Sequence, residues 1–390
     1  APFLIFPCTS VQMKLTGRTL KVALDNHHSY FENRLGVIVN GEQTAILLEK
    51  GEQIIDLSEQ LGDDVNDVLL FKRQDCCHAM TIHGFIVAGE LLALPPRPAR
   101  RMEVYGDSVS AGEVSEAEFA CAQPDPQGHN GLYSNSWLSY SWQAARLLNA
   151  ELHDIATGGM ALLDKTGYFF GPDYIGLESA WDKVNYYPPF GESTPWDFSR
   201  YTPHVVVVAI GQNDHNPVNI MAEDYDSEAS LHWRAEYSRF LGQLREKYPR
   251  AHIVCTTTIL GHDPAWDRAI DECVRSSGDE RIHHFLYTKN GCGTPGHIRG
   301  SEAAVSWLGS SRPWTACGRT DQGIFAGARN VRLCVFCRPE AEYSPFCRVL
   351  SGGVALFHVK YGQQHAVLPM FEKTFVNYDF TPFQHGENHV

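Results

Sequence analysis

The chain has little positive charge for its length. Its 390 residues include 32 Lys and Arg against 46 Asp and Glu, which gives a formal net charge of −14 at pH 7. No run of basic residues is long enough to form a local patch. Binding to a nucleic-acid backbone depends on such clustered positive charge. Nucleic acid is therefore not expected as a partner.

Long hydrophobic runs are missing as well. No apolar stretch approaches the ~20 residues that a membrane-spanning helix needs, so no contact with a membrane is expected. The apolar start, Ala1 to Cys8, is too short for the hydrophobic region of a signal peptide with its flanks. The odd and high count of 11 cysteines favours a cytoplasmic location. Secretion after removal of an upstream segment stays open, because the chain begins with Ala rather than Met.

The cysteines do not predict a disulfide framework, because a chain of this size can bury a large apolar core. Five of them are expected to be buried as small apolar residues: Cys76, Cys77, Cys121, Cys255 and Cys273. The last four include one Cys-x-x-Cys pair: Cys317, Cys334, Cys337 and Cys347. A single such pair with irregular flanks is a weak zinc signal. We expect no metal and no other cofactor.

The first 94 residues carry the signals of β structure. Strand-like segments recur at short spacing: Leu20–Leu24, Leu35–Val39, Val68–Arg73 and Met80–Phe85. Asn40-Gly41 is a strong hairpin signal after the second of these segments. The series predicts a small antiparallel sandwich over residues 1–94. A stiff linker over residues 95–100, containing Pro95-Pro96-Arg97-Pro98, marks the clearest domain boundary.

After this linker, strands alternate with helices. Expected strands are Met102–Tyr105, His204–Ile210, His252–Thr257 and Ile282–Tyr287. Expected helices cover about Ser134–Asn149, Ser227–Lys247 and Ala265–Val274. The four consecutive valines of the second strand are typical of a strand buried on both faces. The alternation predicts a parallel α/β sheet, whose functional residues lie on loops at the carboxyl ends of the strands.

Four of these loops carry candidate residues. They are Gly106-Asp107-Ser108, the segment Ile155–Met160 with Gly158-Gly159, Gly211-Gln212-Asn213-Asp214, and the glycine-rich segment Gly291–His297. Each alone favours an ordinary structural role: a helix cap, a turn glycine, an Asx turn or a surface histidine. Their joint occurrence, in this order and each after an expected strand, favours a shared site.

This set of motifs resembles the SGNH hydrolase superfamily, also called GDSL-like esterases, over about residues 102–308. The resemblance places a catalytic domain at residues 101–309. The leading β domain, with Phe71-Lys72-Arg73 in one strand, is most similar to carbohydrate esterase family 2. The resemblance implies a three-layer SGNH sheet flanked by helices and preceded by a jelly-roll-like β-sandwich. It also implies a nucleophile at Ser108, a general base at His297, and an oxyanion hole made by the backbone N–H groups of Ser108 and Gly159 and the Asn213 amide.

One position departs from the family pattern. Most SGNH enzymes carry an aspartate three residues before the histidine, where this chain has Thr294. Threonine has no carboxylate to stabilise an imidazolium. We expect a Ser–His dyad in which a backbone carbonyl holds the ring, and the alternative is an acid from elsewhere in the chain.

A long insertion between the glycine and asparagine loops is rich in aromatic residues. Aromatic faces with polar edges suit sugar rings, and Trp196 is the candidate for a substrate contact. Packing among the rings themselves is the competing explanation for any single one of them. Asp263 and Trp266 are expected to start and anchor a helix. Residues 310–390 contain β-like runs such as Val354–Val359, but no motif that assigns a role.

The residues and the resemblance together predict a metal-independent serine esterase that removes acetyl groups from an acetylated carbohydrate, such as acetyl-xylan. Alternatives are a lipase or thioesterase acting on longer acyl chains, and a glycan-binding protein whose esterase site has decayed. The β domain either binds glycan or packs against the catalytic domain to shape the wall of its cleft. The sequence leaves the oligomeric state open.

Overall fold

A computed structural model gives the fold of this chain. It describes residues 2–169, 171, 173–258, 260–287, 296–303, 356–361 and 364–369. Ala1–Ala326 form one compact unit and Gly327–Val390 form a second. In the described part of the second unit, β15 (Leu356–Tyr361) and β16 (Gln364–Pro369) pair as an antiparallel hairpin, within the region expected to be β-like. The expected boundaries at 94, 100 and 309 stay predictions.

Two antiparallel sheets make up the N-terminal part of the first unit. One has the order β1 (Phe3–Leu4), β8 (Ala79–Ala88), β3 (Thr19–His27) and β6 (Gly51–Asp56). The other has the order β5 (Glu42–Leu47), β4 (Arg34–Val39), β7 (Asn66–Lys72), β2 (Ser10–Leu15) and β9 (Leu91–Leu92).

The two sheets share one apolar core. Alternate residues of β3, Leu20, Val22 and Leu24, are fully buried in a cluster with Leu35 and Val37 of β4. This period of two is what a strand with one buried face requires. The predicted hairpin between β4 and β5 is present: Asn40 and Gly41 have φ values of 53° and 90°, which a type I′ turn needs. The sequence-based expectation of an antiparallel sandwich is therefore confirmed.

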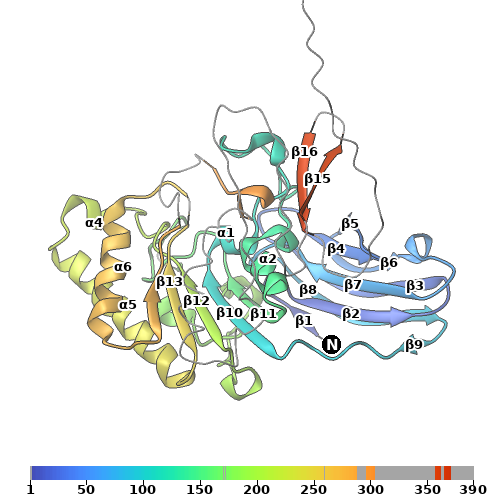
Figure 1. Cartoon of the computed structure of the whole chain (residues 1–390), viewed down its shortest axis with the longest axis horizontal. Coiled ribbons are helices and arrows are strands. Elements are labelled where there is room, and N and C mark those ends of the chain that lie inside the picture. The colour runs from blue at the N-terminus through green and yellow to red at the C-terminus, as the bar shows by residue number, and fades with distance from the viewer. Residues whose placement is uncertain are drawn as a thin grey trace, which may run out of the picture. The chain divides into compact units, whose positions relative to one another are not determined.

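A five-stranded parallel sheet follows. Its order is β11 (Ala150–Ala156), β10 (Arg100–Gly106), β12 (Val205–Ala209), β13 (His252–Thr256) and β14 (Ile282–His284). The valines of β12 are buried on both faces. Val206 and Val208 join the core under α5 (Glu228–Lys247) and α6 (Pro264–Ser277), which lie beside each other in Figure 1. On the opposite face, Val205 and Val207 pack with α2 (Tyr140–Leu147).

This arrangement confirms the predicted three-layer sheet. Shorter helical segments are α1 (Ser108–Ala111), α3 (Leu177–Ala180), α4 (Ile220–Glu223), η1 (Ser58–Gln60), η2 (Glu118–Ala120), η3 (Ser136–Leu138), η4 (Pro188–Phe190) and η5 (Phe198–Arg200). Within the described residues, no helix is both long and apolar enough to cross a membrane.

Three sequence-based expectations can be compared with these elements. The helix expected from about Ser134 begins only at Tyr140, because the Asn135 and Ser139 side chains each accept a backbone N–H and start separate short segments. Cys121 is exposed, so its expected burial was wrong. Asp263 caps α6 through Ala265 N (2.8 Å), and Trp266 is fully buried, as expected.

Candidate active site

Ser108 is held by a tight turn between β10 and α1. An added Cβ at Gly106 would lie 2.0 Å from Ser110 Oγ, so the turn needs glycine there. Asp107 caps the helix, because its Oδ1 accepts the Val109 N–H at 2.9 Å. The helix cap that was one interpretation of the Gly106-Asp107-Ser108 turn is therefore made by Asp107. The Ser108 hydroxyl is left available to another partner.

That partner is His297. Its Nε2 lies 2.8 Å from Ser108 Oγ, and its Nδ1 lies 2.6 Å from Asp125 Oδ2. Because an ionised carboxylate only accepts hydrogen bonds, Asp125 fixes the proton on Nδ1. Nε2 is therefore able to accept the hydroxyl proton of Ser108 when the ring is neutral.

Asp125 overturns the expectation of a dyad held by a backbone carbonyl. A carboxylate does face the imidazole, but it comes from a loop 172 residues earlier in the chain. Thr294, the position that the family pattern points to, lies outside the described residues. Asp125 is itself held by the fully buried Arg299, whose Nη1 lies 3.0 Å from Oδ1, and by the backbone N–H of His297, also at 3.0 Å.

The charges around the imidazole set its proton affinity. Burial by itself lowers the pKa of His297, but the carboxylates of Glu113 and Asp125 outweigh this and raise the pKa to about 9. Glu113 Oε2 lies 3.9 Å from Nε2. Burial raises the pKa of Glu113 to about 7, although the nearby His297 opposes that rise. Burial by itself raises the pKa of Asp125, but the hydrogen bonds from His297 and Arg299 outweigh it and hold that pKa well below its usual range.

The glycine and asparagine loops reach the same sheet edge. Gly106 at the end of β10 is in register with Ala156 of β11 on one side and Ala209 of β12 on the other. Asn213 Nδ2 donates to Asp107 Oδ2 at 2.8 Å, which places its amide over the turn that carries Ser108.

Two backbone donors at this edge are available. Within the described part of the chain, neither Ser108 N–H nor Gly159 N–H has a hydrogen-bond acceptor. Gly159 has a φ of +71°, and an added Cβ would lie 2.8 Å from the Phe169 ring. The site therefore contains the donors that an oxyanion hole requires.

Trp196 is not brought to this site. Its ring contacts join it to His153 (centroids 5.8 Å apart) and to the guanidinium of Arg200 (5.3 Å). His153 lies on the edge strand β11, before its carboxyl end. A substrate contact by Trp196 stays a prediction.

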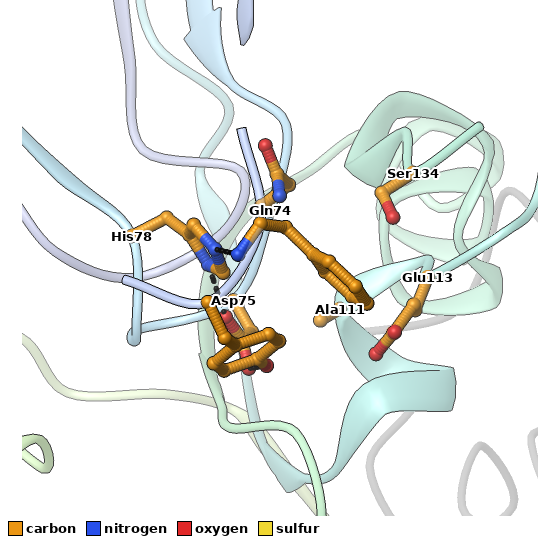
Figure 2. A pocket seen from close by; sticks show the side chains of 8 residues that line it. Gln74, Asp75, His78, Ala111, Glu113 and Ser134 are labelled. Carbon is orange, nitrogen blue, oxygen red and sulfur yellow. Dashed lines mark hydrogen bonds and ion pairs between the residues drawn. The ribbon is translucent and has the colours of Figure 1, made fainter. Parts of the chain in front are cut away.

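A pocket lies beside Glu113, whose carboxylate approaches His297. It is lined by residues of both the sandwich and the parallel-sheet domain: Tyr30, Phe31, Gln74, Asp75, His78, Ala111, Glu113 and Ser134. Figure 2 shows Glu113 and Ala111 on the side of α1, facing Asp75 and His78 across the pocket. Because Glu113 also approaches His297, the sandwich supplies one wall beside the site.

Sequence reasoning missed the residues on this wall and missed Asp125. Asp125 stands in a Gln-Pro-Asp-Pro segment that belongs to no strand or helix, so no periodicity marks it. No group of three or more metal-binding side chains is found in the regions that the structure describes. Cys317, Cys334, Cys337 and Cys347 lie outside those regions.

Comparison with known proteins shows similarity to carbohydrate esterases. The family described as "Carbohydrate esterase 2 N-terminal" matches residues 1–96. The chain is 28% identical over 221 residues to the cellulase/esterase CelE of Acetivibrio thermocellus, and 26% identical over 226 residues to an acetylxylan esterase / glucomannan deacetylase of Cellvibrio japonicus. The chain is thus similar to carbohydrate esterases, and its first 96 residues match the N-terminal part of family 2.

The relatedness extends to the fold of a family 2 enzyme. A family 2 carbohydrate esterase from Clostridium thermocellum, solved with cellohexaose, has a TM-score of 0.66 and 24% identity to this chain. The match covers 83% of this chain and 95% of that one. Each of the two curated relatives matches over 56% of this chain. The matched region is 24% of CelE and 57% of the Cellvibrio protein, so the chain spans only part of the length of each.

Proposed function

We propose that this protein is a serine esterase that removes O-acetyl groups from carbohydrate. The observation that carries the proposal is the continuous series Ser108 Oγ, His297 and Asp125, joined by contacts of 2.8 and 2.6 Å at the carboxyl edge of a parallel sheet. A nucleophile, a base and an orienting acid in hydrogen-bond contact form the arrangement that acyl transfer uses.

The reaction proceeds in two steps. Ser108 Oγ attacks the acetyl carbonyl carbon while His297 Nε2 takes the hydroxyl proton, and Asp125 stabilises the resulting imidazolium. The oxyanion is held by the N–H groups of Ser108 and Gly159 and by the Asn213 amide. His297 returns the proton to the sugar oxygen as the C–O bond breaks. A water molecule, deprotonated by the same histidine, then releases acetate and restores Ser108.

An acetylated polysaccharide is the proposed substrate. The Cellvibrio relative is named an acetylxylan esterase / glucomannan deacetylase, and the Clostridium structure was solved with cellohexaose. The aromatic side chains of Tyr30 and Phe31 beside the site suit the faces of sugar rings.

The test compares wild type, Ser108→Ala and a matched control, Ser115→Ala. Ser115 is also buried, but its hydroxyl donates to the Asn135 carbonyl (2.9 Å) rather than to the histidine. Acetate release from acetyl-xylan, acetyl-glucomannan and acetylated monosaccharides is measured. We expect the rate of acetate release to fall by ~10³-fold or more in Ser108→Ala and to stay near the wild-type rate in Ser115→Ala.

Two outcomes contradict the proposal. Retained acetate release by Ser108→Ala excludes the serine mechanism. A preference for octanoate over acetate among nitrophenyl esters favours the lipase or thioesterase alternative instead.

A further inference from the structure

The peptide unit before the Gly159 donor is held from one side by a tyrosine. Tyr174 Oη donates to the Gly158 carbonyl at 3.0 Å. Burial raises the pKa of Tyr174 far above its usual value, so the hydroxyl keeps its proton and acts as a donor. Tyr174 belongs to the aromatic insertion, for which the sequence left substrate contact and packing among the rings as alternatives.

This hydrogen bond controls the direction of the next N–H. The Gly158 carbonyl and the Gly159 N–H belong to the same planar trans peptide, in which the two groups point in opposite directions. Fixing the carbonyl therefore fixes the line along which the Gly159 N–H points. Glycine at φ +71° has more rotational freedom than other residues, so an unheld peptide here would be able to turn away.

The amide one residue earlier is held from the sandwich domain. Gly158 N–H donates to Asp75 Oδ2 at 2.5 Å. Asp75 Oδ2 also accepts from Tyr30 Oη (3.1 Å), while Oδ1 accepts from Cys77 N (3.1 Å) and lies 3.0 Å from His78 Nδ1. Asp75 is thus a buried carboxylate to which Gly158 is one of four donors.

His78 determines that Asp75 stays an acceptor. The backbone N–H of Phe31 donates to His78 Nε2 at 3.2 Å, so the proton of the neutral ring is on Nδ1 and is donated to Asp75 (Figure 2). Burial favours this neutral ring by lowering the pKa of His78. Because all four partners donate, a protonated carboxyl group or an amide at position 75 would lose at least one of these hydrogen bonds.

We propose that Tyr174 and Asp75 are positioning residues that hold the Gly158 backbone from opposite sides, so that the Gly159 N–H stays aimed at the oxyanion. This inference rests on the proposed esterase function. The pair acts from two places that the SGNH motifs do not include: the aromatic insertion and the sandwich domain. Preorganised donors stabilise a transition state because they need no reorganisation when charge develops.

The test is Tyr174→Phe, which removes one oxygen and keeps the ring. We expect kcat on a nitrophenyl acetate to fall by about 10- to 100-fold with KM within twofold, because an oxyanion donor acts in the transition state and not on the bound ester. The rate at which a 4-nitrophenyl phosphonate ester is attacked by Ser108, with loss of nitrophenolate, should fall by a similar factor, because that adduct also places an oxygen in the hole.

Tyr201→Phe is the matched control. Tyr201 is buried, and its hydroxyl also donates to a backbone carbonyl, that of Met102 at 2.9 Å, near the amino end of the sheet. It should lose thermal stability without loss of kcat. Asp75→Asn is a second variant. It weakens the hold on the preceding peptide, through the Gly158 N–H, and its kcat should fall with KM unchanged.

The outcomes separate the two proposals. If Tyr174→Phe and Asp75→Asn fold and keep kcat within twofold while Ser108→Ala is inactive, the positioning role is refuted and the esterase mechanism stands. If Tyr174→Phe and Tyr201→Phe lose kcat equally, the effect is general destabilisation and the positioning role is again refuted. If Ser108→Ala remains active, the proposed function itself fails.

Discussion

At the scale of single residues, the tautomer of one imidazole decides whether Ser108 has a base. The contact between Asp125 and Nδ1 leaves Nε2 facing the serine, and Arg299 keeps Asp125 in place. Asp125 therefore supplies the carboxylate that most SGNH enzymes carry at the position of Thr294. Arg299 is fully buried, so the loss of Asp125 would leave its charge without this ion-pair partner, which is costly.

The first prediction concerns these two positions. Asp125→Ala should lower kcat by about 10²- to 10⁴-fold, because the ring loses both its orientation and the charge that stabilises the imidazolium. Thr294→Ala is the control and should keep most activity. Steady-state kinetics on a nitrophenyl acetate measure both. A severe loss from Thr294→Ala together with a mild loss from Asp125→Ala would return the role to position 294.

A second prediction concerns pH. His297 acts as a base only when neutral, and the Glu113 carboxylate 3.9 Å away helps to raise its pKa to about 9. Glu113→Gln removes that negative charge, so the pKa of His297 falls and more of the ring is neutral at pH 7. We expect the acidic limb of the kcat/KM profile to move to lower pH and activity at pH 6–7 to rise relative to the maximum.

The matched control for pH is Glu236→Gln. This carboxylate on α5 pairs with Arg239 and does not approach His297. Its profile should coincide with that of wild type. An acidic limb that stays in place in Glu113→Gln would show that Glu113 does not set the proton affinity of the base.

At the scale of elements, the turn after β11 depends on glycine. Gly159→Ala places a Cβ 2.8 Å from Phe169 Cδ2 and 3.0 Å from Tyr168 Cβ, at a φ of +71° that side chains rarely adopt. We expect a loss of about 1–3 kcal/mol in the free energy of unfolding, and a fall in kcat as the N–H donor moves. Urea unfolding and kinetics measure the two effects.

Gly242→Ala is the control for the same substitution. Gly242 is exposed in the middle of α5, and an added Cβ would meet nothing within 4 Å. Alanine there should stabilise the protein by about 0.5–1 kcal/mol. Equal effects at the two positions would contradict a specific steric requirement at Gly159.

Elements with strong patterns were predictable from the sequence. The four valines predicted a strand buried on both faces, and Asn40-Gly41 predicted the hairpin between β4 and β5. The helix from Ser227 to Lys247 agrees with α5, for which Ser227 is the N-cap. Strands without such a pattern were missed. In β6, Gly51–Asp56, both faces are at least partly exposed, so hydrophobicity does not mark a buried face.

At the scale of the whole compact unit, a fully buried aromatic side chain is among the contacts between the sandwich and the parallel-sheet domain. Phe71 on β7 is fully buried, and its ring lies 5.3 Å from that of Trp142 on α2. A Cβ at Gly36 would lie 2.3 Å from the Phe71 ring, so β4 makes room for it. The sandwich and the sheet that carries Ser108 therefore share this contact.

Phe71→Ala should lower the free energy of unfolding by about 3–5 kcal/mol, because it opens a cavity between the two domains. Urea unfolding followed by tryptophan fluorescence measures this loss, and kcat should fall in parallel as Asp75, four residues later, loses support. Phe85→Ala is the control, since Phe85 on β8 is 37% exposed and should cost less than about 1 kcal/mol. Equal losses of unfolding free energy in the two variants would contradict a specific role of Phe71 between the two domains.

The sequence by itself determined which residues reach the edge of the sheet. Ser108, Gly159, Asn213 and His297 follow buried strands or glycine turns, and local hydrophobic patterns with turn residues identify such places. Only the tertiary structure decided what holds these residues. Asp125, Tyr174 and Asp75 come from irregular segments or from the other domain, and a contact between residues far apart in the chain leaves no periodicity or spacing in the sequence.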